Sequence, residues 1–423
     1  MKKLMSVVLC AVFMMAGASP AIAQDKVVLW DVHTANFMKE MVDEAAVRFN
    51  ETSDVKIEAV HLQNDPYKTK LKVVMGAGNP PDIFQSWGGG PLKEYIDGGM
   101  VEPVPEDVLD AVKDTFIPAS FDPVTFDGDV YGLPSAGLTG VYFWYRKDLF
   151  EENGVSVPTT WSELLEVCET LKANGVIPFA LANKNKWTGS FYYMYLADRL
   201  GGKELFQNAL YRKDGVTFED PGYIKAGEMI QDLVKKGYFP EGVNGLDEDL
   251  SQASALLYTK KAGMYLMGTW FMSGANKNYP DMMDQLDFFN FPAVEGGKGD
   301  PSNLIGSPGQ DYTCVTSTSE NMETAFEFLK TEVMNEAWIQ SMVEQGLVPP
   351  VKGATERISD PMQKKIAESF EAAGGVQVYY DQFMPPAMGE VHKNTVQALF
   401  GLEMSPEDVS KAHEEAIQAE LSK

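Results

Sequence analysis

Hydrophobic positions in the N-terminal part of the chain follow two alternating periodicities. Val27–Trp30 is a short apolar run, Phe37–Phe49 repeats apolar residues every three or four positions, and Val55–Val60 alternates apolar with polar residues. The first and third patterns are typical of strands, and the second of an amphipathic helix. Tyr67–Met75 again has helical spacing, and residues 82–84 follow as a third predicted strand. This order predicts a parallel sheet with crossover helices, and hence the α/β class.

The remainder of the chain carries further patterns of both kinds. Residues 159–163 begin a helix that runs to about Lys172, because a capping-type Thr follows Pro158 and an acid lies in the first turn. The later expected elements are strands at residues 176–182, 264–267 and 312–315, and helices at residues 222–236, within 322–342 (one or two) and at 406–421. One αβ unit is therefore followed by a second.

The ends of the first three predicted strands are candidate site positions, because ligands of parallel sheets bind beyond the carboxyl ends of the strands. The polar and aromatic residues at these positions are Asp31, His33, Asn64, Asp65, Gln85 and Trp87.

The N-terminus has the three-part pattern of a secretory signal peptide. A basic start at residues 2–3 precedes an apolar stretch over residues 4–18, and a small-residue cleavage site ends at Ala23. The stretch is short for a membrane span, which needs about 20 residues. Residues 1–23 are therefore expected to be cleaved on export to the periplasm, with an uncleaved anchor as the alternative.

Acidic residues outnumber basic ones by 61 to 35, a formal charge of −26. Without residues 1–23, which hold two lysines and no acid, the balance is 33 − 61 = −28. This excess argues against binding to nucleic acid or to an anionic membrane face. The acids form no blocks and 44% of the residues are hydrophobic, so we expect a globular protein with a solvated acidic surface.

No catalytic or metal-binding motif stands out. The four histidines are scattered, so a zinc site is not expected, and no glycine loop has the spacing of a phosphate-binding or dinucleotide-binding motif. We therefore expect no metal, no cofactor and no enzymatic activity. A glycosidase needs only two facing carboxylates, so a secreted carbohydrate-active enzyme stays an alternative.

Two cysteines remain in the mature chain, Cys168 and Cys314. Cys168 falls in the apolar stripe of a predicted helix, which favours a buried thiol. An exported protein could also join the two in a disulfide, so both states stay open.

Aromatic residues cluster in loops that also hold glycine and polar side chains. Trp87, Trp187 and Trp270 each lie in such a loop, and Tyr379 and Tyr380 precede an acid and an amide. A sugar ring has an apolar face that an aromatic ring can cover and hydroxyls that carboxylates and amides can bind. These loops therefore suggest a sugar site, with core packing as the alternative for each ring.

Six further segments are most specific in combination: Pro81–Gly90, Gly128–Pro134, Trp144–Phe150, Pro158–Leu164, Lys172–Phe179 and Lys261–Trp270. Together they resemble the family 1 extracellular solute-binding proteins, the carbohydrate-binding subunits of ABC importers, of which maltose-binding protein is a distant relative. The resemblance runs over nearly the whole mature chain.

The resemblance implies a two-lobed periplasmic-binding-protein fold, with each lobe a mostly parallel sheet flanked by helices and the ligand in a hinged cleft. Lobe 1 would comprise residues 24–136 plus 314–358, and lobe 2 residues 137–313 plus 359–423. Crossovers would lie near residues 137–140, 311–316 and 355–365. A monomer would bind a mono- or oligosaccharide and deliver it to the membrane permease of an ABC importer.

The resemblance also implies roles for individual residues. Trp270 would stack on the sugar, and Asp381 would accept sugar hydroxyls, with a helix N-cap as the alternative for Asp381. The full candidate ligand-binding set is Asp31, His33, Asn64, Asp65, Gln85, Trp87, Trp187, Trp270, Gln310 and Asp381.

Two positions depart from the family pattern. Arg146 stands where relatives usually have Asn, either as a surface change or as a cation near the hinge for an acidic sugar. Thr139 stands where some relatives place a ligand-contacting Glu. A ferric-ion binding protein of similar architecture is a further alternative, because such proteins use paired tyrosines and the chain has Tyr192–Tyr193 and Tyr379–Tyr380.

Overall fold

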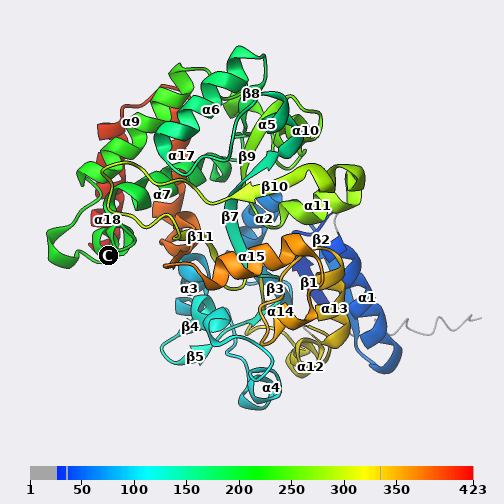
Figure 1. Cartoon of the computed structure of the whole chain (residues 1–423). Helices are drawn as coiled ribbons and strands as arrows, with labels where there is room; N and C mark the ends of the chain where they lie inside the picture. Colours follow the sequence, from blue (N-terminus) through cyan, green and yellow to red (C-terminus); the bar gives the residue numbers. More distant parts are fainter. Residues whose placement is uncertain (1–25, 35–36, 334, 423) are drawn as a thin grey trace, which may run out of the picture.

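The computed structural model describes residues 26–34, 37–333 and 335–422, so the expected signal peptide lies outside the described part. The described elements form two α/β lobes, each built around one main sheet (Figure 1). The predicted fold class is therefore confirmed. No helix within the described residues is long and apolar enough to cross a membrane.

The first lobe is built on a five-stranded sheet in the order β2-β1-β3-β12-β6. β1 (Lys26–Asp31) pairs in parallel with β2 (Lys56–His61) and β3 (Ile83–Ser86), as the strand–helix–strand pattern predicts. β12 (Tyr312–Val315) runs antiparallel to both β3 and β6 (Leu133–Pro134). The sheet is mixed rather than mostly parallel, because β12 enters it on the return of the chain from the second lobe.

The helices of the first lobe are α1 (Phe37–Thr52), α2 (Asn64–Gly76), α3 (Gly89–Asp97), α4 (Glu106–Val112), α12 (Met322–Glu332), α13 (Glu336–Glu344) and α14 (Ala354–Arg357), with a small hairpin of β4 (Thr125–Phe126) and β5 (Asp129–Val130).

The second lobe is built around β7 (Thr139–Arg146), of which every residue is buried. β7 pairs antiparallel with β9 (Ala262–Gly268), β10 (Leu286–Phe289) and β11 (Leu304–Ser307). Two outer strands, β8 (Ile177–Ala180) and β13 (Val376–Gln377), pair in parallel with β9 and β11. This sheet is also mixed, since the central β7 enters from the first lobe.

The helices of the second lobe are α5 (Lys147–Glu152), α6 (Trp161–Ala173), α7 (Trp187–Gly201), α8 (Leu205–Leu210), α9 (Pro221–Lys235), α10 (Gln252–Tyr258), α11 (Phe271–Asn278), α16 (Tyr380–Phe383), α17 (Pro386–Phe400) and α18 (Pro406–Leu421). Helix α15 (Pro361–Glu371) contacts both lobes, because Gln363 donates to the Val343 carbonyl and Lys365 to the Phe288 carbonyl.

Two connecting segments run side by side between the lobes. One joins β6 to β7 and the other joins β11 to β12, close to two of the expected crossovers. They are held together by backbone hydrogen bonds from Ser135 to the Asp311 carbonyl (2.8 Å) and from Gln310 to the Gly137 carbonyl (3.2 Å). The lobe boundaries proposed from the sequence stay a prediction.

Arg146 is neither a surface residue nor a lining residue of the cavity described below. Its side chain is buried and makes a bidentate pair with Asp148, at 2.9 and 2.7 Å, and it donates to the Tyr258 carbonyl at 3.0 Å. The expectation of a surface change is therefore wrong, and the guanidinium is already occupied within the second lobe. The two cysteines, Cys168 in α6 and Cys314 in β12, are buried free thiols.

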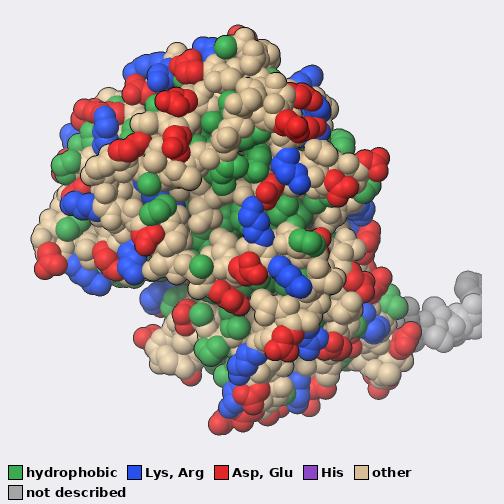
Figure 2. All heavy atoms as spheres, viewed as in Figure 1, with side chains coloured by type: hydrophobic (Ala, Val, Ile, Leu, Met, Phe, Trp, Pro, Cys, Tyr) green, Lys and Arg blue, Asp and Glu red, His purple; other side chains and the backbone are tan. Residues whose placement is uncertain are grey.

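Acidic and basic side chains are interspersed over the face of the molecule shown in Figure 2. This distribution agrees with a solvated acidic surface without charge blocks.

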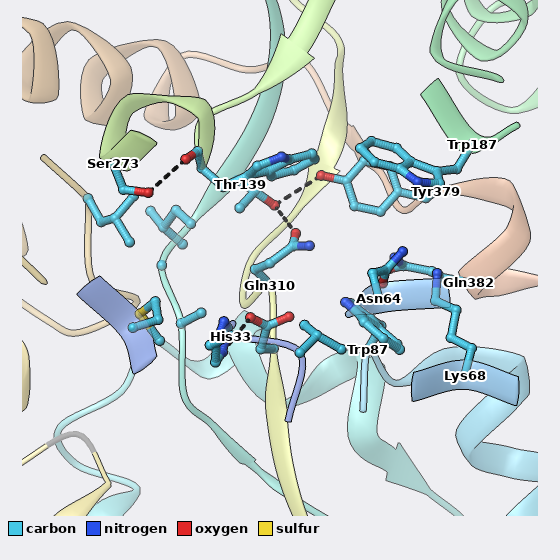
Figure 3. A pocket seen from close by; sticks show the side chains of 18 of the residues that line it. His33, Asn64, Lys68, Trp87, Thr139, Trp187, Ser273, Gln310, Tyr379 and Gln382 are labelled. Carbon is cyan, nitrogen blue, oxygen red and sulfur yellow. Dashed lines mark hydrogen bonds and ion pairs between the residues drawn. The ribbon is translucent and has the colours of Figure 1, made fainter. Parts of the chain in front are cut away.

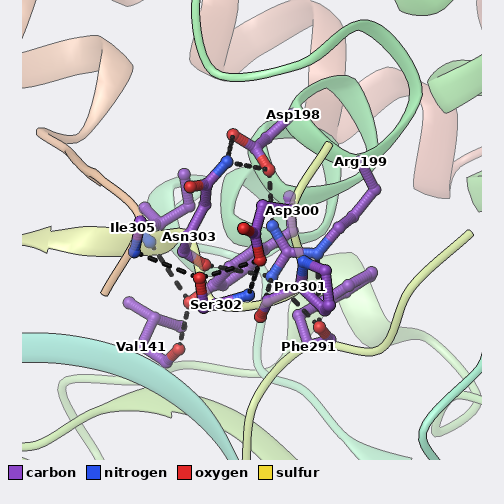
Figure 4. A network of polar contacts seen from close by, with 11 residues as sticks. Val141, Asp198, Arg199, Phe291, Asp300, Pro301, Ser302, Asn303 and Ile305 are labelled. Carbon is purple, nitrogen blue, oxygen red and sulfur yellow. Dashed lines mark hydrogen bonds and ion pairs between the residues drawn. The ribbon is translucent and has the colours of Figure 1, made fainter. Parts of the chain in front are cut away.

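A buried ion pair ties α7 to the loop before β11 (Figure 4). Arg199 is fully buried, pairs with Asp198 at 2.5 Å, and donates to the carbonyls of Phe291, Pro301 and Asn303 at 3.0–3.1 Å. Asp198 also accepts from the Asn303 amide at 3.1 Å. Burial raises the pKa of Asp198, although Arg199 and Asn303 act in the opposite direction. Removal of one member of this network is therefore expected to lower the stability of the fold strongly.

The second lobe also buries two histidines, His392 and His413, each 1% exposed, with ring centroids 5.1 Å apart. Burial lowers the pKa of His392 to about 3 and that of His413 well below its usual value. Both rings are therefore neutral in the folded protein near neutral pH.

We expect acid to destabilise this lobe through these histidines. A histidine in the unfolded chain has a pKa of about 6.5, so the unfolded state binds protons at pH values at which the folded state does not. The free energy of unfolding therefore falls as the pH drops below about 6.5. The loss is about 2 kcal/mol per histidine between pH 7 and pH 5. Urea unfolding at both pH values checks this: His392→Gln should reduce the difference between the two free energies by about 2 kcal/mol. An unchanged difference would contradict it.

Candidate functional site

A cavity of about 230 Å³ lies between the two lobes, and residues of both lobes line it (Figure 3). The connecting segments form part of its wall, through Gly137, Leu138 and Gln310. Movement of one lobe relative to the other would therefore change its shape directly.

The second lobe contributes an aromatic wall: Trp187, Phe191, Trp270 and Tyr379. Trp270 lies at its centre, with its ring centroid 6.2 Å from those of Trp187, Phe191 and Tyr379. The indole of Trp270 packs against Gly268, where a Cβ atom would lie 1.9 Å from the ring, so only glycine permits this position. The wall is thus held by its own contacts before any ligand binds.

Thr139 joins this wall to the connecting segments. Its hydroxyl lies 2.8 Å from the Gln310 amide oxygen, to which it donates, and 3.1 Å from the Tyr379 hydroxyl. Figure 3 shows the three side chains together on one side of the cavity. They orient Tyr379, and the amide nitrogen of Gln310, which has no hydrogen-bond partner among the described residues, is available to a ligand acceptor.

The first lobe contributes a polar floor. His33 lies 3.7 Å from the Asp311 carboxylate, and both residues are buried. Burial raises the pKa of Asp311 to about 6, while His33 and Gln85 act in the opposite direction. At neutral pH Asp311 is therefore mostly an anion that can accept hydrogen bonds from hydroxyl groups.

A cation and a further acid lie near the rim. The Lys68 ammonium is 4.6 Å from the centroid of the Trp87 ring, and Asp381 is 4.0 Å from Lys393. Burial lowers the pKa of Lys68, and the Asp381 and Asp65 carboxylates act in the opposite direction. The cavity therefore combines aromatic faces with hydrogen-bonding groups, and these include both cations and carboxylates.

Most of the residues proposed from the sequence meet at this cavity. Those that line it are His33, Asn64, Trp87, Trp187, Trp270, Gln310 and Asp381. Asp381 lies within α16 rather than at its N-cap, which is Tyr379.

The other three proposed residues, Asp31, Gln85 and Asp65, do not line the cavity. Asp31 is the last residue of β1 and binds His61 at 2.7 Å, and Gln85 lies within β3 and accepts from the Val32 amide at 3.0 Å. Asp65 instead binds Asn185 of the second lobe. The observed strands end one or two residues beyond the predicted ends, so Asp31 and Gln85 are buried within the sheet of the first lobe.

Several lining residues were absent from the proposed set: Lys68, Thr139, Phe191, Asp249, Ser273, Asp311, Tyr379 and Gln382. Lys68 was predictable, because it lies four positions after Asn64 and therefore shares its face of α2. Ser273 was predictable for a similar reason, because it lies three positions after Trp270 in the first turn of α11. Asp249 comes from a part of the second lobe with no strand-end pattern, so no sequence signal identified it.

No group of three or more His, Cys, Asp or Glu side chains among the described residues is arranged to hold a metal ion. The arrangement binds through shape, aromatic faces and hydrogen bonds.

Residues 31–331 match the family model described as bacterial extracellular solute-binding protein, which is more than half of the chain. The chain belongs to this family.

Three similar proteins illustrate the relationship. An uncharacterized ABC transporter extracellular-binding protein of Pyrococcus horikoshii is 28% identical over 243 residues, which are 56% of this chain and 54% of the relative, so the match spans about half of its length. The galactooligosaccharide-binding protein of Bacillus subtilis is 25% identical over 402 residues, 93% of this chain and 88% of the relative. A structure from Caldanaerobius polysaccharolyticus, solved in a study of xylan utilization, is 30% identical with a TM-score of 0.84, covering 92% of this chain and 99% of the other.

Proposed function

We propose that this protein binds a mono- or oligosaccharide in the interlobe cavity and delivers it to the permease of an ABC importer. The observation that carries the proposal is the aromatic wall facing a floor of carboxylate, imidazole and amide groups. An aromatic face covers the C–H face of a sugar ring, and the polar groups bind its hydroxyls. The sugar-binding relative of Bacillus subtilis, which aligns over nearly the whole chain, supports the same class of ligand.

Three finer statements belong to the same proposal. The protein acts in the periplasm after cleavage of residues 1–23, it is a monomer, and its lobes comprise residues 24–136 plus 314–358 and residues 137–313 plus 359–423. The family description, an extracellular solute-binding protein, supports export. The residues proposed to touch the sugar are those of the proposed set that line the cavity.

Ferric-ion binding is less well supported. Of the four tyrosines that suggested it, only Tyr379 lines the cavity. Tyr192, Tyr193 and Tyr380 are buried, and burial raises the pKa of each, which disfavours the phenolate that iron needs. A colourless protein whose melting temperature does not respond to ferric ion would exclude this function.

A thermal-shift panel of neutral and acidic sugars tests the proposal. A ligand at about 100 times its dissociation constant adds about 2.7 kcal/mol of apparent stability, so a bound sugar should raise the melting temperature clearly. The recovered sugar should be unchanged, since the protein is proposed to be a receptor and not an enzyme. If no sugar of the panel raises the melting temperature, the proposed function is wrong.

A further inference from the structure

A charge-assisted hydrogen bond joins the two lobes at the rim of the cavity. The Asn185 amide nitrogen in the second lobe donates to the Asp65 carboxylate in the first lobe at 2.9 Å. Both partners are close in sequence to residues that line the cavity. Asn64 directly precedes Asp65, and Trp187 lies two positions after Asn185. The bond therefore lies where the lobes come together around a ligand.

Both side chains are oriented before they meet. The Asn185 amide oxygen accepts from the Glu248 backbone at 2.8 Å, so its nitrogen faces the first lobe. The second oxygen of Asp65 accepts from Asn64 at 3.3 Å, within the first turn of α2. Since Asn185 is 9% exposed, water competes little for its side chain, and a hydrogen bond to a carboxylate is stronger than a neutral one.

The polar contacts between the lobes at the opposite rim are weaker, because they are either exposed to water or lack a charged partner. Lys277 pairs with Glu40 at 2.8 Å, but the two side chains are 42% and 62% exposed, and exposed ion pairs contribute little. Asn276 donates to the Gln345 carbonyl at 3.2 Å, without a charge to strengthen the bond.

We propose that the Asp65–Asn185 hydrogen bond is a clasp that holds the lobes together over the ligand and slows ligand release. The bond forms only when the two lobes are in contact, so it stabilises the closed state and does not stabilise the open state. Apparent affinity scales with the population of the binding-competent state, so a weaker clasp lowers affinity without any change in the ligand contacts. The ligand readout of this inference rests on the proposed function.

The test exchanges donor and acceptor across the lobes. Asn185→Asp keeps the oxygen that accepts from Glu248 but sets two carboxylates against each other, and should weaken sugar binding about tenfold, mainly through faster release. Asp65→Asn in the same chain restores a donor–acceptor pair with reversed direction, and should return the affinity to within about threefold of the parent. Calorimetry and stopped-flow release give both quantities, with the sugar that raises the melting temperature most as ligand.

A ligand-free measurement separates this inference from the proposed function. Asn185→Asp should increase the radius of gyration measured by X-ray scattering, and the double variant should reverse the increase, whether or not any sugar binds. The control Lys277→Ala removes the exposed interlobe pair and should change affinity less than twofold. If Asn185→Asp binds and scatters like the parent, or if Asp65→Asn fails to rescue it, the clasp is wrong. If the parent binds no sugar while the scattering changes as expected, only the proposed function fails.

Discussion

Replacing Trp270 with alanine is expected to weaken sugar binding by about 30-fold or more. The ring is the centre of the aromatic wall and is held by Gly268 behind it and by Trp187, Phe191 and Tyr379 around it. Loss of a central aromatic anchor commonly costs 2 kcal/mol or more of binding free energy, which corresponds to about 30-fold or more in the dissociation constant. Isothermal titration with the sugar identified in the thermal-shift panel measures the loss.

A tryptophan away from the cavity provides the matched control. Trp161 in α6 is 9% exposed and stacks on Phe291 with ring centroids 6.0 Å apart, within the second lobe. Trp161→Ala should lower stability but leave the affinity of the folded protein unchanged, because Trp161 does not line the cavity. Undiminished affinity in Trp270→Ala, or an equal loss in both variants, would remove Trp270 from the proposed site.

The largest expected effect on stability comes from Arg199. Arg199→Met keeps the apolar stem but leaves Asp198 as a buried acid supported only by Asn303, and leaves three carbonyls without their donor. Removal of one partner of a buried ion pair typically costs 3–5 kcal/mol, so we expect a loss of about that size in the free energy of unfolding. Urea unfolding monitored by tryptophan fluorescence measures it.

Two comparisons identify the cause of that loss. Arg357→Met breaks an exposed pair with Glu336 and should cost less than about 1 kcal/mol. Asp198→Asn combined with Arg199→Met removes the stranded charge and should recover part of the stability. A cost for Arg199→Met no larger than that for Arg357→Met would contradict the importance of the network.

The order of strands and helices was predictable from the sequence because it depends on local periodicity. The run 312–315 and the helix 406–421 were predicted with the observed bounds. The acid expected in the first turn of α6 is Glu163, which forms a capping box with Thr160, one position after the Thr159 that follows Pro158. Capping needs only residues three positions apart, so no tertiary information is required. The parallel arrangement of β1, β2 and β3 followed from the same local pattern.

The direction of the remaining strands was less predictable, since it depends on how the chain passes between the lobes. β7 and β12 both follow connecting segments, and both pair antiparallel with their neighbours. A short apolar run has the same pattern in either direction, so the mixed sheets were visible only in the structure.

The sequence by itself determined the α/β class, the positions of the first three strands with their helices and of several later elements, the family and the aromatic loops from which the cavity wall is built. Each of these depends on residues close together in the chain or on motifs matched segment by segment. Only the tertiary structure decided which polar side chains turn to the cavity. Asp65 and Asn64 are adjacent in sequence, yet Asn64 lines the cavity and Asp65 reaches Asn185, which is 120 positions away. Arg146 likewise pairs with Asp148 inside the second lobe. These choices depend on how two separately built lobes pack together, and hydrophobic periodicity carries no information about that packing.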